Sequence, residues 1–194
     1  ILRDLCRQIL NDIPVAWLPG NHDELDCLFD SFSEPPFTPA KLLGCGGGCN
    51  SWQVLLLNSK GSTPSGVVSA THLAQIKTIL QQLPQTQPVA VFCHHHLLPM
   101  NGYIDKHIMA NGEALLALLS EFPQVKCISH GHVHQPQETI ISRQQVDDIY
   151  LWATPSTSIQ FKPGSYAADV EDSGPAFRRF DLSVDGQGNS RVKS

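Results

Sequence analysis

Short apolar runs that end in polar, histidine-rich clusters constrain this sequence more than any other feature. The motif Gly20-Asn21-His22-Asp23 follows a run at 15–18, His94-His95-His96 follows a run at 89–93, and His130-Gly131-His132-Val133-His134 follows a run at 125–129. Continuous apolar runs of this length are typical of strands buried in a parallel sheet. Because ligand sites of such sheets lie beyond the carboxyl ends of the strands, we expect the three clusters to form one shared site.

Helical patterns separate these runs. Apolar residues recur at helical spacing in 1–12 and in 69–83, where Ser69 can cap the helix, and Asn111 can cap a third helix that continues through 115–119. A further buried strand is predicted at 53–58, whereas 31–50 is rich in proline, serine and glycine and is predicted to be an irregular connection. The alternation of strand and helix predicts an α/β fold with helices covering a sheet.

After residue 134 the pattern changes to strands without intervening helices. Runs at 139–141 and 149–152 flank one polar turn, and runs at 176–184 and from 191 onward flank Asp185-Gly186-Gln187-Gly188. We therefore expect a β meander to complete a single domain that covers residues 1–194.

Length and composition exclude several classes of protein. The chain has 194 residues, which suits one domain, and 16% of them are charged, below the roughly 25% of average soluble proteins. A disordered polyelectrolyte is thereby excluded. The formal net charge of −5 argues against non-specific nucleic-acid binding, and no apolar run approaches the ~20 residues of a membrane helix. We expect neither nucleic acid nor a membrane as a partner.

The cysteines are expected to be free thiols in a reducing compartment. Cys93 and Cys127 lie within apolar runs, where cysteine behaves as a small hydrophobic residue. Cys45 and Cys49 flank three glycines and lack the second cysteine pair of a zinc finger. No secretory signal is visible, and a cytoplasmic location is predicted.

The three clusters carry the side chains of a metal site. Neutral imidazole is the commonest metal ligand in proteins, and Asn21 offers a neutral carbonyl oxygen. His132 and His134 lie two residues apart on a tight turn and could serve one ion or two neighbouring ions. His22 is free to act as an acid, and Asp23 could accept a hydrogen bond from it and keep it cationic.

The remaining histidines are assigned less specific places. His95 and His96 could line a pocket or lie in an exposed loop, and the sequence leaves both possibilities open. His130 is expected to pack behind its loop. His72 and His107 are expected to be ordinary surface or core residues.

Taken in order, these residues resemble the calcineurin-like metallophosphoesterases. The likeness rests on Gly20-Asn21-His22-Asp23, on a strand that ends at His94, and on Gly131-His132-Val133-His134. Segments 17–23, 94–99, 153–157 and 160–163 further resemble bacterial class III 3′,5′-cyclic-AMP phosphodiesterases of the CpdA/Icc type. The likeness runs from about 15 to 192. It implies a four-layer αββα sandwich with two mixed sheets, and hydrolysis of cyclic AMP to 5′-AMP.

The resemblance also implies a role for each matching residue. Asn21, His94 and His132 would bind one metal ion, and His134 would bind a second. His94 is preferred over His95 because it lies nearest the strand end and keeps the family's spacing to His132. His22 would be catalytic, protonating the leaving oxygen with Asp23 beside it, and Asn21, His22 and His134 would contact the nucleotide substrate. The ions would be divalent or trivalent, with iron, manganese and zinc as the candidates.

Two further blocks of the family, Asp-x-His and Gly-Asp, do not occur before Asn21. The resemblance therefore implies an N-terminally truncated domain with a partial metal site, and phosphodiesterase activity in the intact parent protein. An uncovered sheet edge makes a homo-oligomer plausible. Three alternatives remain open: another phosphodiesterase or pyrophosphatase of the same superfamily, a non-catalytic remnant that binds a metal ion or a nucleotide, and a mononuclear zinc hydrolase.

Overall fold

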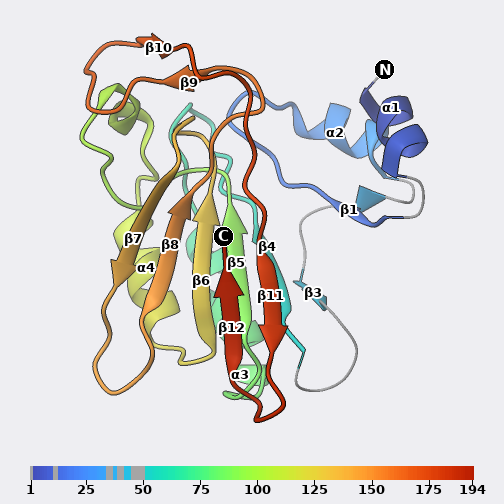
Figure 1. Ribbon diagram of the computed structural model, residues 1–194, viewed down its shortest axis with the longest axis vertical. Helices are drawn as coiled ribbons and strands as arrows, with labels where there is room; N and C mark the ends of the chain where they lie inside the picture. Colours follow the sequence, from blue (N-terminus) through green and yellow to red (C-terminus); the bar gives the residue numbers. More distant parts are fainter. Residues whose placement is uncertain (1, 11–12, 34–36, 39–41, 45–50) are drawn as a thin grey trace.

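A six-stranded mixed sheet lies at the centre of the computed structural model, which describes the chain apart from residues 1, 11–12, 34–36, 39–41 and 45–50 (Figure 1). The order across the sheet is β3-β4-β5-β6-β8-β7. Its strands are β3 (Leu42–Gly44), β4 (Gln53–Leu57), β5 (Val89–Cys93), β6 (Val125–His130), β7 (Gln137–Ile141) and β8 (Ile149–Ala153). Strands β4, β5, β6 and β8 run parallel, whereas β3 and β7 add antiparallel edges. Four carboxyl ends therefore meet at one edge.

Helices α3 (Ala70–Gln82) and α4 (Gly112–Ser120) connect the parallel strands and cover one face of the sheet (Figure 1). The predicted cap of α3 is confirmed, because the Ser69 hydroxyl accepts a hydrogen bond from the backbone N–H of His72 at 3.1 Å. Burying one large aliphatic side chain stabilises a fold by about 1.5–3 kcal/mol. The core between helices and sheet contains the fully buried residues Leu80, Val91, Leu115, Leu119 and Ile128.

Asn111 stands just before α4, as predicted, but makes no side-chain capping bond to it. Instead, its Oδ1 accepts from the backbone N–H of Val68 at 3.0 Å, and its Nδ2 donates to the carbonyl of Val68 at 2.6 Å. The amide side chain thus pairs with the backbone of another loop as a strand would. Val68 lies 43 residues from Asn111 in the sequence, outside any local capping pattern.

A two-stranded hairpin of β11 (Asp181–Val184) and β12 (Ser190–Lys193) covers the other face of the sheet (Figure 1). Trp52 and Trp152 are buried beneath it, and the indole N–H of Trp52 donates to the carbonyl of Ser183 at 2.9 Å. The turn at Asp185 was predicted. The strand predicted from 176 begins only at Asp181, because the preceding residues form an extended segment without strand pairing.

The remaining described elements are short. Helix α2 (Leu25–Ser31) and the 3-10 helix η1 (Tyr103–His107) were not predicted. The segment predicted to be irregular contains β3 and part of a parallel pair, whereas Cys45 and Cys49 lie outside the described residues. None of the described helices is long and apolar enough to cross a membrane. The other elements are α1 (Leu2–Leu10), β1 (Val15–Ala16), β2 (Phe37–Thr38), β9 (Gln160–Phe161) and β10 (Val170–Glu171).

Candidate metal centre

The carboxyl ends of the parallel strands are level with one another. Leu57 pairs with Cys93, Cys93 pairs with His130, and His130 pairs with Ala153 across the four strands. Segments 58–60, 94–96 and 131–134 leave the sheet from this row. The register therefore brings two of the three polar clusters to one place, as the sequence predicted for a sheet of this type.

Three donor atoms from three separate segments meet at this edge. The Nε2 of His94 lies 2.9 Å from Oδ1 of Asn21 and 3.2 Å from Nδ1 of His132. Asn21 belongs to the loop after β1, so the third cluster joins the other two. His94, His95 and His132 also form a group whose possible ligand atoms all lie within 4.8 Å of one another.

The turn that carries His132 and His134 has an unusual backbone. Both histidines adopt positive φ angles, 69° at His132 and 52° at His134, in the left-handed region that few non-glycine residues enter. Between them Val133 is fully buried, packed near Ile104 and Ala153, and its N–H donates to the carbonyl of Gly131 at 2.8 Å. Strained conformations of this kind cost about 1–3 kcal/mol and concentrate at functional sites.

Burial keeps the imidazoles of the cluster uncharged. Burial, and secondarily the neighbouring imidazoles, lowers the pKa of His94 to about 3 and that of His132 to about 2. Burial also lowers the pKa of His134. A neutral ring has one nitrogen with a free lone pair, which is the form that binds a metal ion.

The structure resolves the open question on His95 and His96, because both side chains are fully buried. The Nε2 of His96 lies 3.2 Å from Oδ1 of Asp105, a residue of η1, and its ring stacks on His132 at a centroid distance of 5.6 Å. His130 is buried as expected, and its Nδ1–H donates to the carbonyl of Gly131 at 3.1 Å.

His72 and His107, both expected to be ordinary surface or core residues, lie in different surroundings. His72 is exposed on α3. His107, at the end of η1, lies with its ring centroid 6.4 Å from that of His132 and therefore borders the cluster.

The Asn21 loop is held by contacts that include one the sequence did not predict. Oδ2 of Asp23 accepts a hydrogen bond from the backbone N–H of Gly20 at 2.7 Å, whereas the sequence suggested His22 as its partner. His22 itself is exposed. Lys60 donates from Nζ to the carbonyl of Asn21 at 3.2 Å. Any side chain at position 20 would collide with His94, because a Cβ there would lie 2.8 Å from its Cε1.

His134 lies apart from the other predicted ligands, on the side of β9. Its Nδ1–H donates to the carbonyl of Ile159 at 2.9 Å, and its ring stacks on Phe161 with centroids 4.8 Å apart. Because the carbonyl can only accept, Nδ1 carries the proton and Nε2 has the free lone pair.

Cys93 stands immediately before His94 but contributes no ligand. Its thiol is buried, donates to the carbonyl of His95 at 3.3 Å, and has a pKa raised by burial to about 12. Metal ions bind the thiolate form, which burial disfavours here.

The donor set fits a divalent metal ion. Two neutral imidazoles and one amide oxygen are ligands that zinc, manganese and iron accept. The Nε2 of His132 is the other nitrogen of that ring, and it is buried without a hydrogen-bond partner among the described residues.

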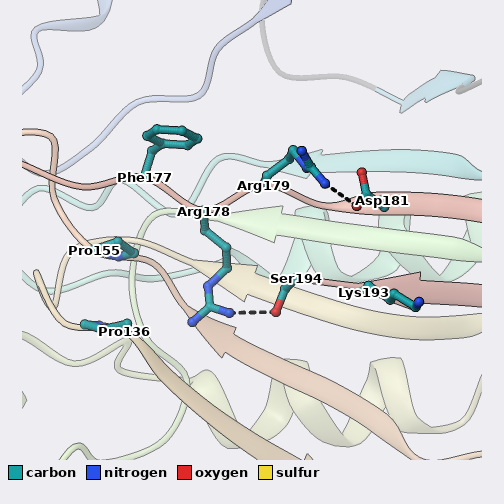
Figure 2. Close-up of a pocket in the computed structure, with 8 residues that line it drawn as sticks. All are labelled: Pro136, Pro155, Phe177, Arg178, Arg179, Asp181, Lys193 and Ser194. Carbon is teal, nitrogen blue, oxygen red and sulfur yellow. Dashed lines mark hydrogen bonds and ion pairs between the residues drawn. The ribbon is translucent and has the colours of Figure 1, made fainter.

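A separate cavity of about 420 Å³ lies beside the β11–β12 hairpin (Figure 2). Arg178 donates to the hydroxyl of Ser194 at 2.7 Å, and Arg179 pairs with Asp181 at 2.9 Å. The cavity includes no imidazole and none of the predicted site residues. It is lined by Pro136, Pro155, Phe177, Arg178, Arg179, Asp181, Lys193 and Ser194.

The chain is similar to known proteins over most of its length. The profile of the family described as calcineurin-like phosphoesterase matches residues 1–136. A probable cyclic nucleotide phosphodiesterase of Pseudoalteromonas sp. is 39% identical over 176 residues, which is 91% of this chain and 63% of that protein. The 3′,5′-cyclic adenosine monophosphate phosphodiesterase CpdA of Haemophilus influenzae is 36% identical, covering 93% of this chain and 63% of its own length.

Two more matches agree with these. CpdA of Escherichia coli is 33% identical over 89% of this chain and 60% of its own length. The crystal structure of a dimetal phosphatase from Danio rerio superposes with a TM-score of 0.55 at 15% identity, over 79% of this chain and 63% of that one. The chain thus spans about three fifths of the length of these relatives.

Proposed function

Because the chain belongs to the calcineurin-like phosphoesterase family, we propose that it carries metal and substrate ligands of a phosphodiesterase that opens 3′,5′-cyclic nucleotides. The preferred substrate is cyclic AMP, and the product is 5′-AMP. One observation carries the proposal: His94 Nε2, Asn21 Oδ1 and His132 Nδ1 meet at the carboxyl ends of parallel strands. The names of the relatives support the substrate class.

Asn21, His94 and His132 are the residues that would hold one metal ion of manganese, iron or zinc. When bound, the ion would supply Lewis-acid chemistry at the phosphoryl group. The protein holds its ligands ready for that ion, because both rings stay neutral and Gly20 lets the His94 ring approach the Asn21 loop. The lysine contact to the Asn21 carbonyl fixes the loop from a second side.

His22 is the proposed acid. It is exposed next to Asn21, and it lies near enough to His94 and His134 to lower the pKa of each. From this place it donates a proton to the 3′ oxygen as the bond from that oxygen to phosphorus breaks. Asp23 positions the loop by holding the Gly20 N–H, and this keeps His22 beside the ligand Asn21.

His134 is proposed to serve a second ion and to border the nucleotide. Its hydrogen bond to Ile159 fixes the tautomer in which Nε2 is free, and the stacked Phe161 fixes the plane of the ring. Such outer contacts orient a ligand before the metal ion arrives.

A second candidate function is metal binding without hydrolysis. It is favoured by the ligand group itself, because the clustered residues found among the described parts are histidines and include no carboxylate. Two-ion phosphoesterase chemistry needs charge neutralisation of both ions, which a carboxylate supplies more effectively than imidazole.

Incubating the intact parent protein with Mn²⁺ and cyclic AMP, then separating nucleotides by chromatography, tests the proposal. We expect 5′-AMP to appear only with metal present and not in the variant His132→Ala. Cyclic GMP and bis(p-nitrophenyl) phosphate in parallel measure the preference for cyclic AMP. Metal binding without any 5′-AMP would favour the second candidate.

A further inference from the structure

Ser59 lies in the loop directly after β4. It contacts His94 and His95, the two residues that directly follow the neighbouring strand β5. Its side chain has no exposed surface. The Ser59 Oγ lies 3.3 Å from the backbone nitrogen of His94, 3.2 Å from that of His95 and 2.9 Å from Nδ1 of His95. One hydroxyl therefore links the backbone of two adjacent histidines to the ring of the second.

The direction of each hydrogen bond follows from the groups involved. A backbone N–H can only donate, so Oγ accepts from His94 and from His95. The hydroxyl proton is then free to be donated to Nδ1 of His95. On the far side of that ring, Nε2 lies 3.2 Å from the carbonyl of Pro64, which can only accept. His95 is thus held in the tautomer with its proton on Nε2.

Both ring nitrogens of His95 are consequently occupied. The ring is also enclosed, since a Cβ on Gly66 would lie 2.4 Å from Cγ of His95, and the N–H of Val67 donates to the carbonyl of Ser59 at 3.0 Å. His94 differs, because its Nε2 faces Asn21 and His132 and no such carbonyl. Proximity alone would include His95 in the ligand group.

We propose that Ser59 is a positioning residue that selects His94 rather than His95 as the metal ligand. It does so by anchoring the backbone of both residues and by engaging Nδ1 of His95 with its hydroxyl proton. This inference rests on the proposed metal site, but it does not depend on which phosphodiester is hydrolysed, or on whether hydrolysis occurs.

A titration of the ¹⁵N-labelled chain with Zn²⁺, followed by long-range ¹H–¹⁵N spectra of the histidine rings, tests the assignment without any variant. We expect His95 to show the Nε2–H tautomer before zinc is added and to keep its ring shifts afterwards. The rings of His94 and His132 should shift. A zinc-dependent shift of the His95 ring nitrogens like that of a ligand, or a proton on its Nδ1, would overturn the proposal.

The variant Ser59→Ala adds a second measurement. Removing an outer-shell partner of a ligand typically weakens metal binding about 10- to 100-fold, and we expect a loss in this range by calorimetry with Zn²⁺. The His95 ring should at the same time lose its fixed tautomer. Unchanged zinc affinity in a folded Ser59→Ala variant would contradict the proposal, and the wild-type titration decides the matter if that variant does not fold.

Ser129 offers a matched control. It is a buried serine of β6, the strand on the other side of β5, but its hydroxyl has no hydrogen-bond partner among the described residues. Ser129→Ala should leave both zinc affinity and the His95 tautomer as they are in the wild type. A similar loss in both variants would mean that any buried serine beside the site has this effect, and would overturn a specific role for Ser59.

Discussion

His94 and Asn21 meet at 2.9 Å between Nε2 and Oδ1, although 73 residues separate them in the sequence. The contact joins the loop after β1 to the end of a central strand. Both groups belong to the proposed ligand site, which neither segment forms alone.

Replacing either partner should weaken metal binding strongly. We expect His94→Ala and Asn21→Ala each to reduce Zn²⁺ affinity more than about 100-fold, beyond the range typical of outer-shell partners. Calorimetric titration measures the effect. His72→Ala, at an exposed position of α3, is the control and should bind zinc as the wild type does. Wild-type affinity in both site variants would refute the ligand assignment.

Gly20→Ala should disturb the contact between His94 and Asn21, because it adds a side chain next to the His94 ring. The added Cβ would lie 2.8 Å from Cε1 of His94, so the ring must move away from Asn21. Zinc affinity should fall while the thermal midpoint changes by only a few degrees. Gly186→Ala is a matched control, because nothing lies within 4 Å of its Cβ position. Equal affinities of the two variants would show that the close approach does not matter.

His22→Ala should separate catalysis from metal binding. As the proposed proton donor, His22 should contribute about 10²- to 10⁴-fold to kcat on cyclic AMP, whereas zinc affinity should stay within about twofold of the wild type. Steady-state kinetics and calorimetry on one protein preparation test this. A large loss of zinc affinity would place His22 among the ligands instead.

Unfolding of the metal-free chain should become easier in mild acid. Burial lowers the pKa of His130 to about 4, whereas the unfolded chain has a histidine pKa near ~6.5. The unfolded state therefore binds more protons between these values, and stability is lost as the pH falls from about 6.5 towards 4. For His130 alone the loss between pH 7 and pH 5 is about 2 kcal/mol.

Urea denaturation at these two pH values, with EDTA present, measures that loss. The variant His130→Asn keeps an N–H donor for the Gly131 carbonyl but cannot take up the proton. The free energy of unfolding of this variant should change less between pH 7 and pH 5 than that of the wild type. Equal free energies of unfolding at pH 7 and pH 5 in the wild type would contradict the prediction.

The fold class and the family could be predicted because their signals are local. The strands at β4, β5 and β6 are continuous apolar runs, Ser69 caps a helix of regular spacing, and two of the three polar clusters lie at the ends of β5 and β6. These predictions, and the relation to the cyclic nucleotide phosphodiesterases, are confirmed. The strand expected before the first cluster is only the two-residue β1, which pairs with β2 outside the central sheet. The assignment of ligands and of the proton donor stays a prediction.

What the sequence did not provide depends on contacts between distant segments. Asn111 pairs with Val68 rather than with its own helix, and Asp23 with Gly20 rather than with His22. Neither hydrogen-bond partner can be inferred from the local pattern of polar and apolar residues. The difference between His94 and His95 has the same origin, because the Ser59 hydroxyl that distinguishes them lies on another strand end.

The buried thiol of Cys93 bears on which metals this protein can discriminate. It is adjacent to His94 along the chain, yet burial raises its pKa to about 12, and its S–H donates to the carbonyl of His95. Among the described residues, the atoms that meet at Asn21, His94 and His132 are nitrogen and oxygen, whereas soft ions such as Cu(I) or Cd²⁺ prefer sulfur. We therefore expect this group of nitrogen and oxygen atoms to favour ions of borderline or hard character over thiophilic ones.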